Sequence, residues 1–402
     1  MATERDGRSS SDEGSVVLRP LRDFLHTEAA GGVVLLIAAL VAIVWANSPW
    51  KASYVELWHT RLAIDLGGHV LDLDLRDWVN DGLMAVFFFV VGLEIKRELV
   101  EGELRDRRQA ATPALAALGG MVVPALIYLG FNVGGAGQDG WGIPMATDIA
   151  MAVGVLSLLG SRVVPSIKVF LLALAIVDDI GAIVVIAVFY ASQFEVLPFL
   201  VALAVVGAIV VVQRLGVDAV AVYVVLGAGL WLALHESGVH ATLAGVALGL
   251  LTPTRRRRRG ESESVVEWLE HGLHPWTSFA IVPLFALANA GIPISADSLS
   301  HAASSTITYG VIVGLVLGKL VGVTAATWLA VRLRIGDLPS AASWRSIVGI
   351  GALAGIGFTV SIFVTGLAFD DVALQDEAKL GILTASLLAA MLGAAVLTVR
   401  RR

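Results

Sequence analysis

Apolar stretches of about 20 residues recur along nearly the whole chain, and they restrict its fold more than any other feature. Each is long enough to cross a hydrocarbon core of about 30 Å as an α-helix. Only 15% of the 402 residues are charged, whereas a soluble domain has about 25%. The sequence therefore predicts an all-α membrane protein whose many spans pack as one bundle.

About twelve spans are expected. The predicted ranges are 29–48, 78–95, 110–131, 141–160, 167–191, 195–213, 216–235, 238–252, 276–292, 306–331, 346–369 and 379–398. We expect a single transmembrane domain over residues 29–398. A polar, irregular tail over residues 1–28 would precede it, and a short basic tail over 399–402 would follow.

The charged loops indicate the orientation. An even number of spans places these basic residues on one side: Lys96, Arg97, Arg105, Arg107, Arg108, Arg162, Lys168, Arg214, Arg255 to Arg259, Arg332, Arg334, Arg345 and Arg400 to Arg402. The opposite loops near 132–140, 192–194, 236–237 and 293–305 hold no Lys or Arg, and only the first opposite loop is an exception. The positive-inside rule then predicts that both chain ends are cytoplasmic.

Two loops have patterns of their own. The first outer loop, within residues 58–76, contains RLAIDLGGHVLDLDL at 61–75, which alternates around Gly67-Gly68 and predicts a β-hairpin. Its edge either stays at the surface or pairs with a second copy of the chain. The cytoplasmic loop 253–275 holds Arg255 to Arg259, which favour anionic lipid, and SVVEWLEHGLHPW, which favours an interfacial amphipathic helix.

Among the ionisable residues inside predicted spans, four stand out: Asp148, Asp178, Asp179 and Lys319. A charge near the bilayer centre costs at least about 2.5–3.5 kcal/mol, so each residue indicates a functional site with a partner. Asp178 and Asp179 are adjacent, so on a helix they point about 100° apart. One can face an ion cavity while the other finds a different partner. A purely structural set of ion pairs is the alternative, above all for Lys319.

Interrupted helices are expected at two of the spans. Gly142 and Pro144 weaken the helix before Asp148, and GIGALAGIGFTVSIF near the eleventh span carries four glycines in a short run. Such a pair of interrupted spans predicts two inverted repeats, formed by spans three to five and spans ten to twelve. The ion site would lie between them near the middle of the membrane, where carbonyl groups freed by the interruptions and the dipoles of the half-helices stabilise ions. Asp148 could instead only cap a half-helix.

The remaining composition excludes other classes. The net charge of −6 lies almost wholly in loops, and no basic surface for nucleic acid is indicated. The chain has no cysteine, so disulfides, thiolate chemistry and cysteine metal sites are ruled out.

With these residues established, the chain resembles the NhaA-type sodium/proton antiporters over about residues 20 to 398. The motifs that carry the resemblance are NDGLMAVFFFVVGLEIKREL, ATDIAMAVGVLSLLGSR, ALAIVDDIGAI, SGVHATLAGV, LEHGLHPW, LFALANAG and GIGFTVSIF. One departure is GKLVG around Lys319, where the family often has proline after the lysine.

The resemblance implies a role for each matching residue. Asp179 and Asp148 would be the main sodium or lithium ligands, Thr147 would add an oxygen, and Asp178 would pair with Lys319. The cytoplasmic funnel and pH-sensing set would comprise Glu94, Lys96, Arg97, Glu98, Glu270 and His271, with Asp81 in the second span and His240 also linked to the pH response. For His240 a packing role, and for Glu94 to Glu98 an ordinary solvated helix end, are the alternatives.

The resemblance further implies an activity. The family exports sodium in exchange for more than one proton, is electrogenic, and is active at alkaline but not acidic pH. It resides in the bacterial inner membrane, needs no cofactor and dimerises through the hairpin at 61–75. Physics agrees, because a hard cation prefers oxygen ligands, and a desolvated carboxylate can hold either a proton or a cation.

Two other functions are considered. A cation-coupled carrier of organic solutes would need a larger pocket with hydrogen-bonding side chains. An intramembrane aspartyl protease also uses two acids, but its GxGD signature is absent, and adjacent aspartates cannot face each other across a water. We therefore expect a transporter rather than an enzyme.

Overall fold

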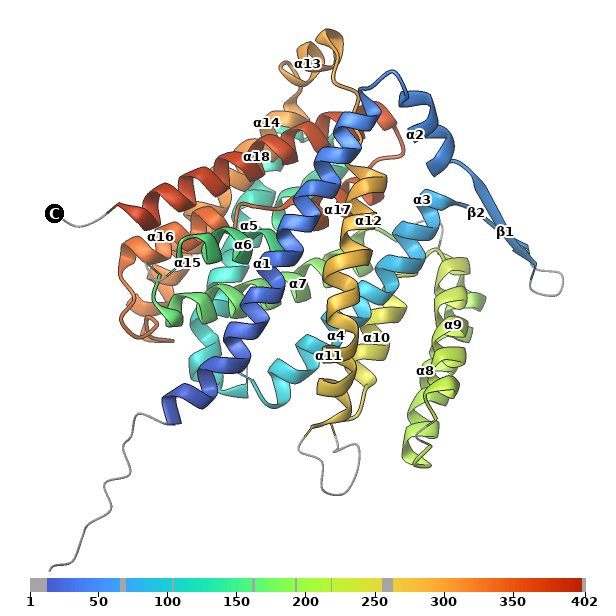
Figure 1. Ribbon diagram of the computed structural model, residues 1–402, viewed down its shortest axis with the longest axis horizontal. Helices are drawn as coiled ribbons and strands as arrows, with labels where there is room; N and C mark the ends of the chain where they lie inside the picture. The colour runs from blue at the N-terminus through green and yellow to red at the C-terminus, as the bar shows by residue number, and fades with distance from the viewer. Residues whose placement is uncertain are drawn as a thin grey trace, which may run out of the picture.

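The protein is described from a computed structural model, and most of its described residues are helical (Figure 1). The structure describes residues 13–65, 70–102, 105–160, 163–191, 194–217, 219–254 and 263–399. Helices pack side by side into one bundle, and a two-stranded hairpin projects from it. The predicted fold class is confirmed.

The elements follow in chain order. The first half contains α1 Glu13–Ala46, α2 Lys51–Trp58, β1 Arg61–Asp65, β2 Val70–Asp74, α3 Leu75–Asp77, the π-helix η1 Trp78–Leu83, α4 Met84–Val100, α5 Arg107–Asn132, the 3-10 helix η3 Gln138–Met145, α6 Ile149–Leu158, α7 Pro165–Phe189 and α8 Val196–Arg214. The second half contains α9 Val220–Glu236, α10 Leu243–Leu251, α11 Val265–Trp276, the π-helix η5 Thr277–Ile281, α12 Val282–Asn289, α13 Ala296–Ala302, α14 Thr306–Val313, the π-helix η6 Gly314–Gly318, α15 Lys319–Arg332, α16 Trp344–Leu353, α17 Phe358–Ala368 and α18 Val372–Thr398.

All twelve predicted spans contain helix. Within the described residues, seven helices are long and apolar enough to cross a membrane, or eight when the bent pair α16 and α17 counts as one span. These eight match predicted spans 1, 3, 4, 5, 6, 10, 11 and 12. The other four ranges are helical too, in η1–α4, α9, α10 and η5–α12. The chain is a multi-pass membrane protein.

Two predicted segments differ from the structure. Helix α1 begins at Glu13, so the part of the predicted irregular tail from residue 13 onward is helical. Helix α11 covers the segment predicted to be an amphipathic helix, but it is not a separate helix, because it continues through η5 into α12 and buries Glu270. The hydrogen-bonded capping box of Ser264 and Glu267 starts this helix. The Arg255 to Arg259 run lies outside the described residues.

The predicted hairpin is confirmed. Strands β1 and β2 pair antiparallel, with Arg61 opposite Asp74 and Asp65 opposite Val70. Every residue of β1 is exposed in the single chain, and Figure 1 shows the hairpin projecting away from the bundle. The Gly67-Gly68 turn lies outside the described residues. We call the end of the bundle that carries this hairpin and Asp81 the hairpin side, and the end that carries Arg97 the Arg97 side.

Small residues let two helix pairs approach closely. A Cβ atom on Gly245 would lie 2.0 Å from the Ala85 carbonyl oxygen, so α10 contacts the α4 backbone directly. A Cβ on Gly322 would lie 2.2 Å from the Gly119 carbonyl oxygen, which brings α15 against α5. Helices in lipid associate through such packing, because lipid tails remove the hydrophobic driving force between them. The α5–α15 contact places Lys319 within the bundle.

Candidate functional site

The site is built on two interrupted helical segments. In the first, η3 ends at Met145, residues up to Asp148 are extended, and α6 begins at Ile149. In the second, α16 ends at Leu353 and α17 begins at Phe358 after a bend of 46°. Both breaks fall in the predicted spans, because proline and glycine there lower helix stability.

The two interruptions hydrogen-bond to each other. The Asp148 backbone N–H donates to the Ile356 carbonyl at 2.6 Å, and the Thr147 hydroxyl donates to the Ala354 carbonyl at 2.9 Å. The Ser361 hydroxyl donates to the Ile143 carbonyl at 2.7 Å. Unwinding frees these backbone groups, and a buried peptide group needs a partner. The breaks therefore stabilise one another and hold their side chains together.

Asp148 accepts hydrogen bonds through both carboxylate oxygens. Oδ1 accepts from the Met151 backbone N–H at 3.0 Å, so Asp148 caps α6. Oδ2 accepts from the Thr359 backbone N–H at 3.0 Å and from its hydroxyl at 2.7 Å. The capping role considered from the sequence is thus present. The Thr359 contacts go beyond capping, because they come from the other interrupted segment.

Lys319 and Asp178 form an ion pair in the middle of the protein. Lys319 Nζ lies 2.6 Å from Asp178 Oδ2, and both side chains are 0% exposed. Nζ also donates to the Thr147 hydroxyl at 3.1 Å. The π-helix η6 ends immediately before Lys319. The residue that follows this lysine is Leu320, at the position where the family often has proline. Thr147 therefore connects the ion pair to the interrupted helix, in addition to lining the cavity described next.

Asp179 points into a small buried cavity together with Asp148. The cavity measures about 70 Å³ and is lined by Glu28, Gly31, Phe87, Val90, Val91, Glu94, Thr147, Asp148, Ile149, Ala150, Asp179, His274, Thr277, Ser278, Val282, Thr359 and Val360. Asp178, which pairs with Lys319, is not part of the lining. The adjacent acids thus have the separate surroundings that their positions on one helix predict.

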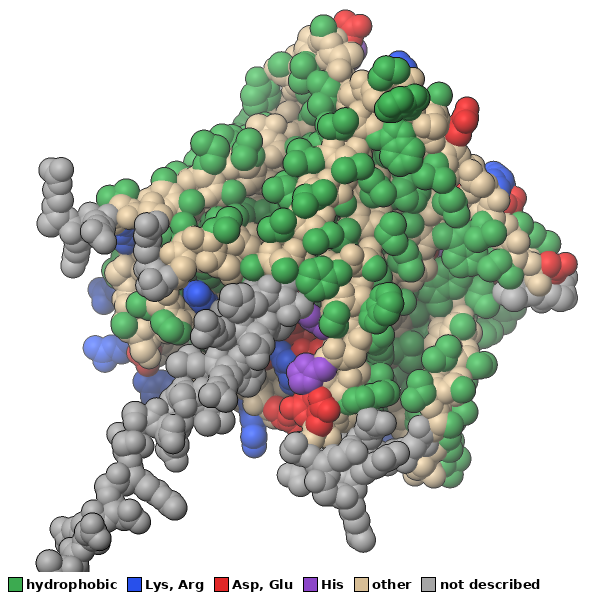
Figure 2. Space-filling view, in the orientation of Figure 1, with side chains coloured by type: hydrophobic (Ala, Val, Ile, Leu, Met, Phe, Trp, Pro, Cys, Tyr) green, Lys and Arg blue, Asp and Glu red, His purple; other side chains and the backbone are tan. Residues whose placement is uncertain are grey.

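Charged groups surround the part of the cavity nearest the Arg97 side. His274 Nε2 lies 2.8 Å from Glu28 Oε1, and the Ser278 hydroxyl donates to the same oxygen at 3.2 Å. Arg97 Nη1 lies 2.5 Å from Glu270 Oε1. Figure 2 shows acidic, basic and histidine side chains gathered around the lower parts of α4 and α11, on a face that is otherwise mostly hydrophobic.

The predicted pH-sensing set does not lie in one place. Glu94 lines the cavity, whereas the exposed His271 pairs with Glu263 at 2.7 Å. Asp81 and His240 face each other at 3.7 Å on the hairpin side. Asp81 and Glu94 lie 13 residues apart in η1–α4, which is about 20 Å along a helix axis. The structure thus divides the set between two sides.

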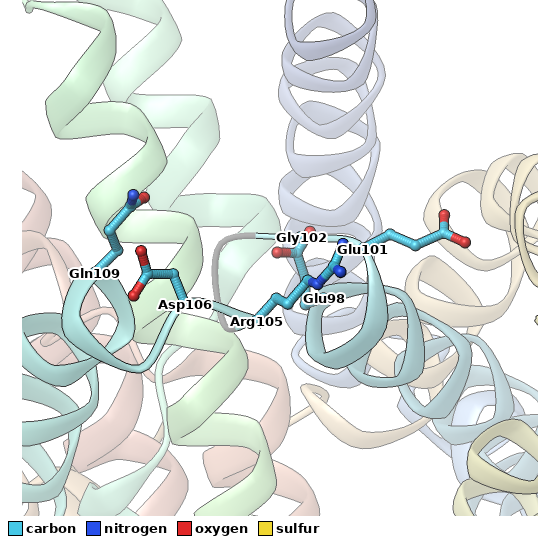
Figure 3. A pocket seen from close by; sticks show the side chains of 6 residues that line it. All are labelled: Glu98, Glu101, Gly102, Arg105, Asp106 and Gln109. Atoms are coloured by element: carbon cyan, nitrogen blue, oxygen red, sulfur yellow. The ribbon is translucent and has the colours of Figure 1, made fainter.

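A second hollow is larger but lies at the surface. It measures about 580 Å³ and follows the connection from α4 to α5, lined by Glu98, Glu101, Gly102, Arg105, Asp106 and Gln109 (Figure 3). None of the four ionisable residues predicted within spans lines it. It is therefore separate from the buried cavity.

Sequence reasoning missed five polar residues that line the cavity, Glu28, His274, Thr277, Ser278 and Thr359. Thr359 lies within GIGFTVSIF, where a hydroxyl beside a helix break is the available signal. His274 lies in the LEHGLHPW motif but does not stand out from its neighbours there. Glu28 belongs to the predicted tail, and its burial at 6% exposure cannot be read from the sequence.

The His274–Glu28 contact makes the stability of the protein depend on pH. Burial opposes protonation of His274, but the hydrogen bond and charge of Glu28, with Glu94 and Glu270, raise the pKa of His274 above its ordinary value of 6.5. A histidine whose pKa is raised on folding contributes its full stabilisation at low pH, where it is protonated. This stabilisation is lost as the pH rises through the pKa of the histidine in the folded protein.

We expect wild type to exceed His274→Gln in stability by roughly 1 kcal/mol at about pH 5.5 and by almost nothing at about pH 9. Thermal unfolding of the purified proteins in detergent measures this difference. The exposed His301 supplies the matched control His301→Gln, which should not change the pH dependence. If the difference in stability between wild type and His274→Gln increased toward alkaline pH, the stabilising role of protonated His274 would be contradicted.

Known proteins are similar to this chain over nearly its whole length. A family model described as Na+/H+ antiporter 1 matches residues 22–397. A Na+/H+ antiporter NhaA of Acidovorax sp. (strain JS42) is 51% identical over 92% of this chain and 89% of that protein. Another NhaA, from Mesorhizobium japonicum, is 50% identical over 94% of each chain. Sorangium cellulosum has an NhaA 2 that is 46% identical over 94% of this chain and 90% of its own length.

Proposed function

Because the chain belongs to the Na+/H+ antiporter 1 family, it exchanges sodium for protons across a membrane, and we propose that Asp148 and Asp179 bind these ions in turn. The observation that carries the proposal is their position in one buried cavity, at 2% and 8% exposure. The positive charge of Lys319 is already compensated by Asp178. The two cavity acids therefore need a mobile cation to neutralise them.

Competition between the ions explains exchange. A buried carboxylate is stable when it is protonated or when it holds a cation, and a single carboxylate does not do both well. Sodium is a hard cation that prefers oxygen ligands, and Asp148, Asp179 and the Thr359 hydroxyl offer oxygens around the cavity. Proton binding then releases sodium, and sodium binding releases protons. Lithium, with the same preference, is the second substrate.

The direction and regulation complete the proposal. The basic loops support cytoplasmic chain ends in a bacterial inner membrane, so the Arg97 side faces the cytoplasm. Rocking of the bundle around the interrupted helices would expose the site alternately. Sodium leaves, more than one proton enters, and transport is electrogenic and activated at alkaline pH. The exposed edge of β1 supports dimerisation through the hairpin, and the basic loops support contact with anionic lipid.

The alternatives fit less well. A carrier of organic solutes needs a pocket of about 300 Å³ or more, whereas the buried cavity measures about 70 Å³. A protease that used the adjacent acids Asp178 and Asp179 would need them to share one water, but Asp178 is held by Lys319 at 2.6 Å and does not line the cavity. The relatives named above are transporters. We propose that ion exchange requires no bound cofactor.

The activity is tested in inside-out membrane vesicles that hold an imposed proton gradient reported by a pH-sensitive dye. Addition of sodium or lithium should collapse the gradient, potassium should have little effect, and the response should increase with pH. No collapse with any alkali cation between about pH 7 and 9 would contradict cation antiport.

Thr359 should set the affinity for sodium. In Thr359→Val the hydroxyl that donates to Asp148 Oδ2 is lost, so the carboxylate is held less firmly and one oxygen leaves the cavity. We expect the free energy of sodium binding to weaken by about 1–2 kcal/mol, which should raise the sodium concentration for half-maximal exchange by about 5- to 30-fold. Dye assays over a range of sodium concentrations measure this effect.

A matched control is Thr384→Val, because the Thr384 hydroxyl lies on the exposed face of α18 and, within the described part of the chain, donates to the Leu380 carbonyl alone. It should leave the sodium dependence unchanged. An unaltered sodium dependence in Thr359→Val would show that Thr359 does not contribute to the ion site.

A further inference from the structure

A cluster of aromatic rings lies next to the buried cavity. Phe363 of α17 is at its centre, with its ring centroid 5.4 Å from Phe88 of α4 and 6.2 Å from Phe285 of α12. The His240 ring meets Phe363 edge-on at 5.1 Å. The three phenylalanines are between 1% and 4% exposed. Three helices and the connection before α10 thus meet on one ring.

Two of the three phenylalanines, Phe363 and Phe285, lie about one helical turn beyond the cavity. Thr359 and Val360 line the cavity, and Phe363 follows Thr359 by four residues, about one turn. On α12, Val282 lines the cavity and Phe285 follows by three residues. On α4, Phe88 lies between the lining residues Phe87 and Val90, at the level of the cavity itself. The rings therefore cover the end of the cavity that faces the hairpin side.

Polar groups resume on the far side of the rings. His240 Nε2 lies 3.7 Å from Asp81 Oδ1, and His235 Nδ1 lies 3.7 Å from Asp81 Oδ2. The rings of His235 and Trp231 stack at 5.4 Å, and the Trp231 indole N–H donates to the Asp81 carbonyl at 2.9 Å. The aromatic cluster is therefore an apolar layer between two polar regions.

We propose that Phe363 is the gate that closes the ion site toward the hairpin side. This inference rests on the proposed function. An apolar constriction blocks a hydrated cation, because the ion cannot leave its water without replacement ligands. Phe363 sits on the helix that also carries Thr359, so the helix that presents a donor to Asp148 also closes the path. The Asp81–His235–His240 cluster forms the polar vestibule beyond the gate.

Chemical labelling tests the gate without requiring transport. The chain has no cysteine, so Val360→Cys places a unique thiol in the cavity. A membrane-impermeant methanethiosulfonate reagent is added in sodium-free buffer, to right-side-out vesicles for access from the hairpin side and to inside-out vesicles for access from the Arg97 side. Ala63→Cys on the exposed β1 reports which side is accessible.

Removing the ring should open the cavity. We expect Phe363→Ala to increase the rate of Val360→Cys labelling from the hairpin side by about tenfold or more. Phe363→Leu, which keeps apolar bulk, should stay close to the parent rate. The matched control is Phe279→Ala, because Phe279 is 41% exposed and lies outside the cluster; it should also leave the rate unchanged.

The outcomes are distinguishable. Labelling from the Arg97 side at the parent rate shows that a variant is folded. A folded Phe363→Ala that labels no faster from the hairpin side overturns the gate. If Phe363→Ala does not reach the membrane, Phe363→Ser, which also removes both the ring and its apolar bulk, decides by the same comparison. Failure of sodium to drive proton release would contradict the proposed function but would not alter the labelling result.

Discussion

Replacing Asp179 with asparagine is expected to reduce sodium-driven proton release by about a hundredfold or more. The side chain keeps its shape, but the amide neither releases a proton nor neutralises a sodium ion. Asp179 is 8% exposed and lines the cavity. Because little water reaches this position, water cannot replace the negative charge of the carboxylate as a partner for sodium. About 3 kcal/mol of lost ion binding corresponds to this reduction.

The measurement uses the dye in inside-out vesicles at about pH 8.5, with sodium and then lithium. Asp337→Asn is the matched control, because Asp337 is 82% exposed at its side chain and contacts only Arg108, at 3.6 Å, among charged groups of the described residues. The control should exchange ions at the wild-type rate. If Asp179→Asn retained more than about a tenth of the wild-type activity, Asp179 would not be an essential ion ligand.

Replacing Lys319 with methionine is expected to destabilise the protein by about 3–5 kcal/mol. Lys319 and Asp178 are both 0% exposed and lie 2.6 Å apart. Removing the ammonium group leaves the Asp178 carboxylate buried without its counter-charge, and this penalty exceeds the loss of the pair itself. Protonation of Asp178 would relieve part of the cost of burying its unpaired carboxylate, so Lys319→Met should lose less stability at acidic pH.

Rescue separates an uncompensated charge from a packing defect. The double variant Asp178→Asn/Lys319→Met has no buried charge at the pair and should recover most of the lost stability. Thermal unfolding of the purified proteins in detergent measures all the variants. A double variant as unstable as Lys319→Met alone would assign the defect to lost packing of the lysine stem. The exposed Lys51 provides the matched control Lys51→Met, which should leave the stability nearly unchanged.

Much of the architecture followed from local pattern. Apolar length predicted the helices, and the confirmed hairpin followed from alternation on both sides of a glycine pair. The breaks near Asp148 and after Leu353 followed from proline and glycine, because these residues weaken a helix wherever it lies. The helix start at Glu13 was missed, because charged residues and Pro20 interrupt the apolar residues there, so that no membrane-length apolar run forms.

The sequence alone determined that acids lie within membrane spans and that Asp178 and Asp179 point in different directions, because helix geometry is local. The tertiary structure decided their partners. Asp148 meets Thr359 across 211 residues, and Asp178 meets Lys319 across 141. Burial of Glu28 against Ser278, 250 residues away, was also decided there. Such contacts depend on which helix faces pack together, and that arrangement is a property of the whole bundle rather than of any one segment.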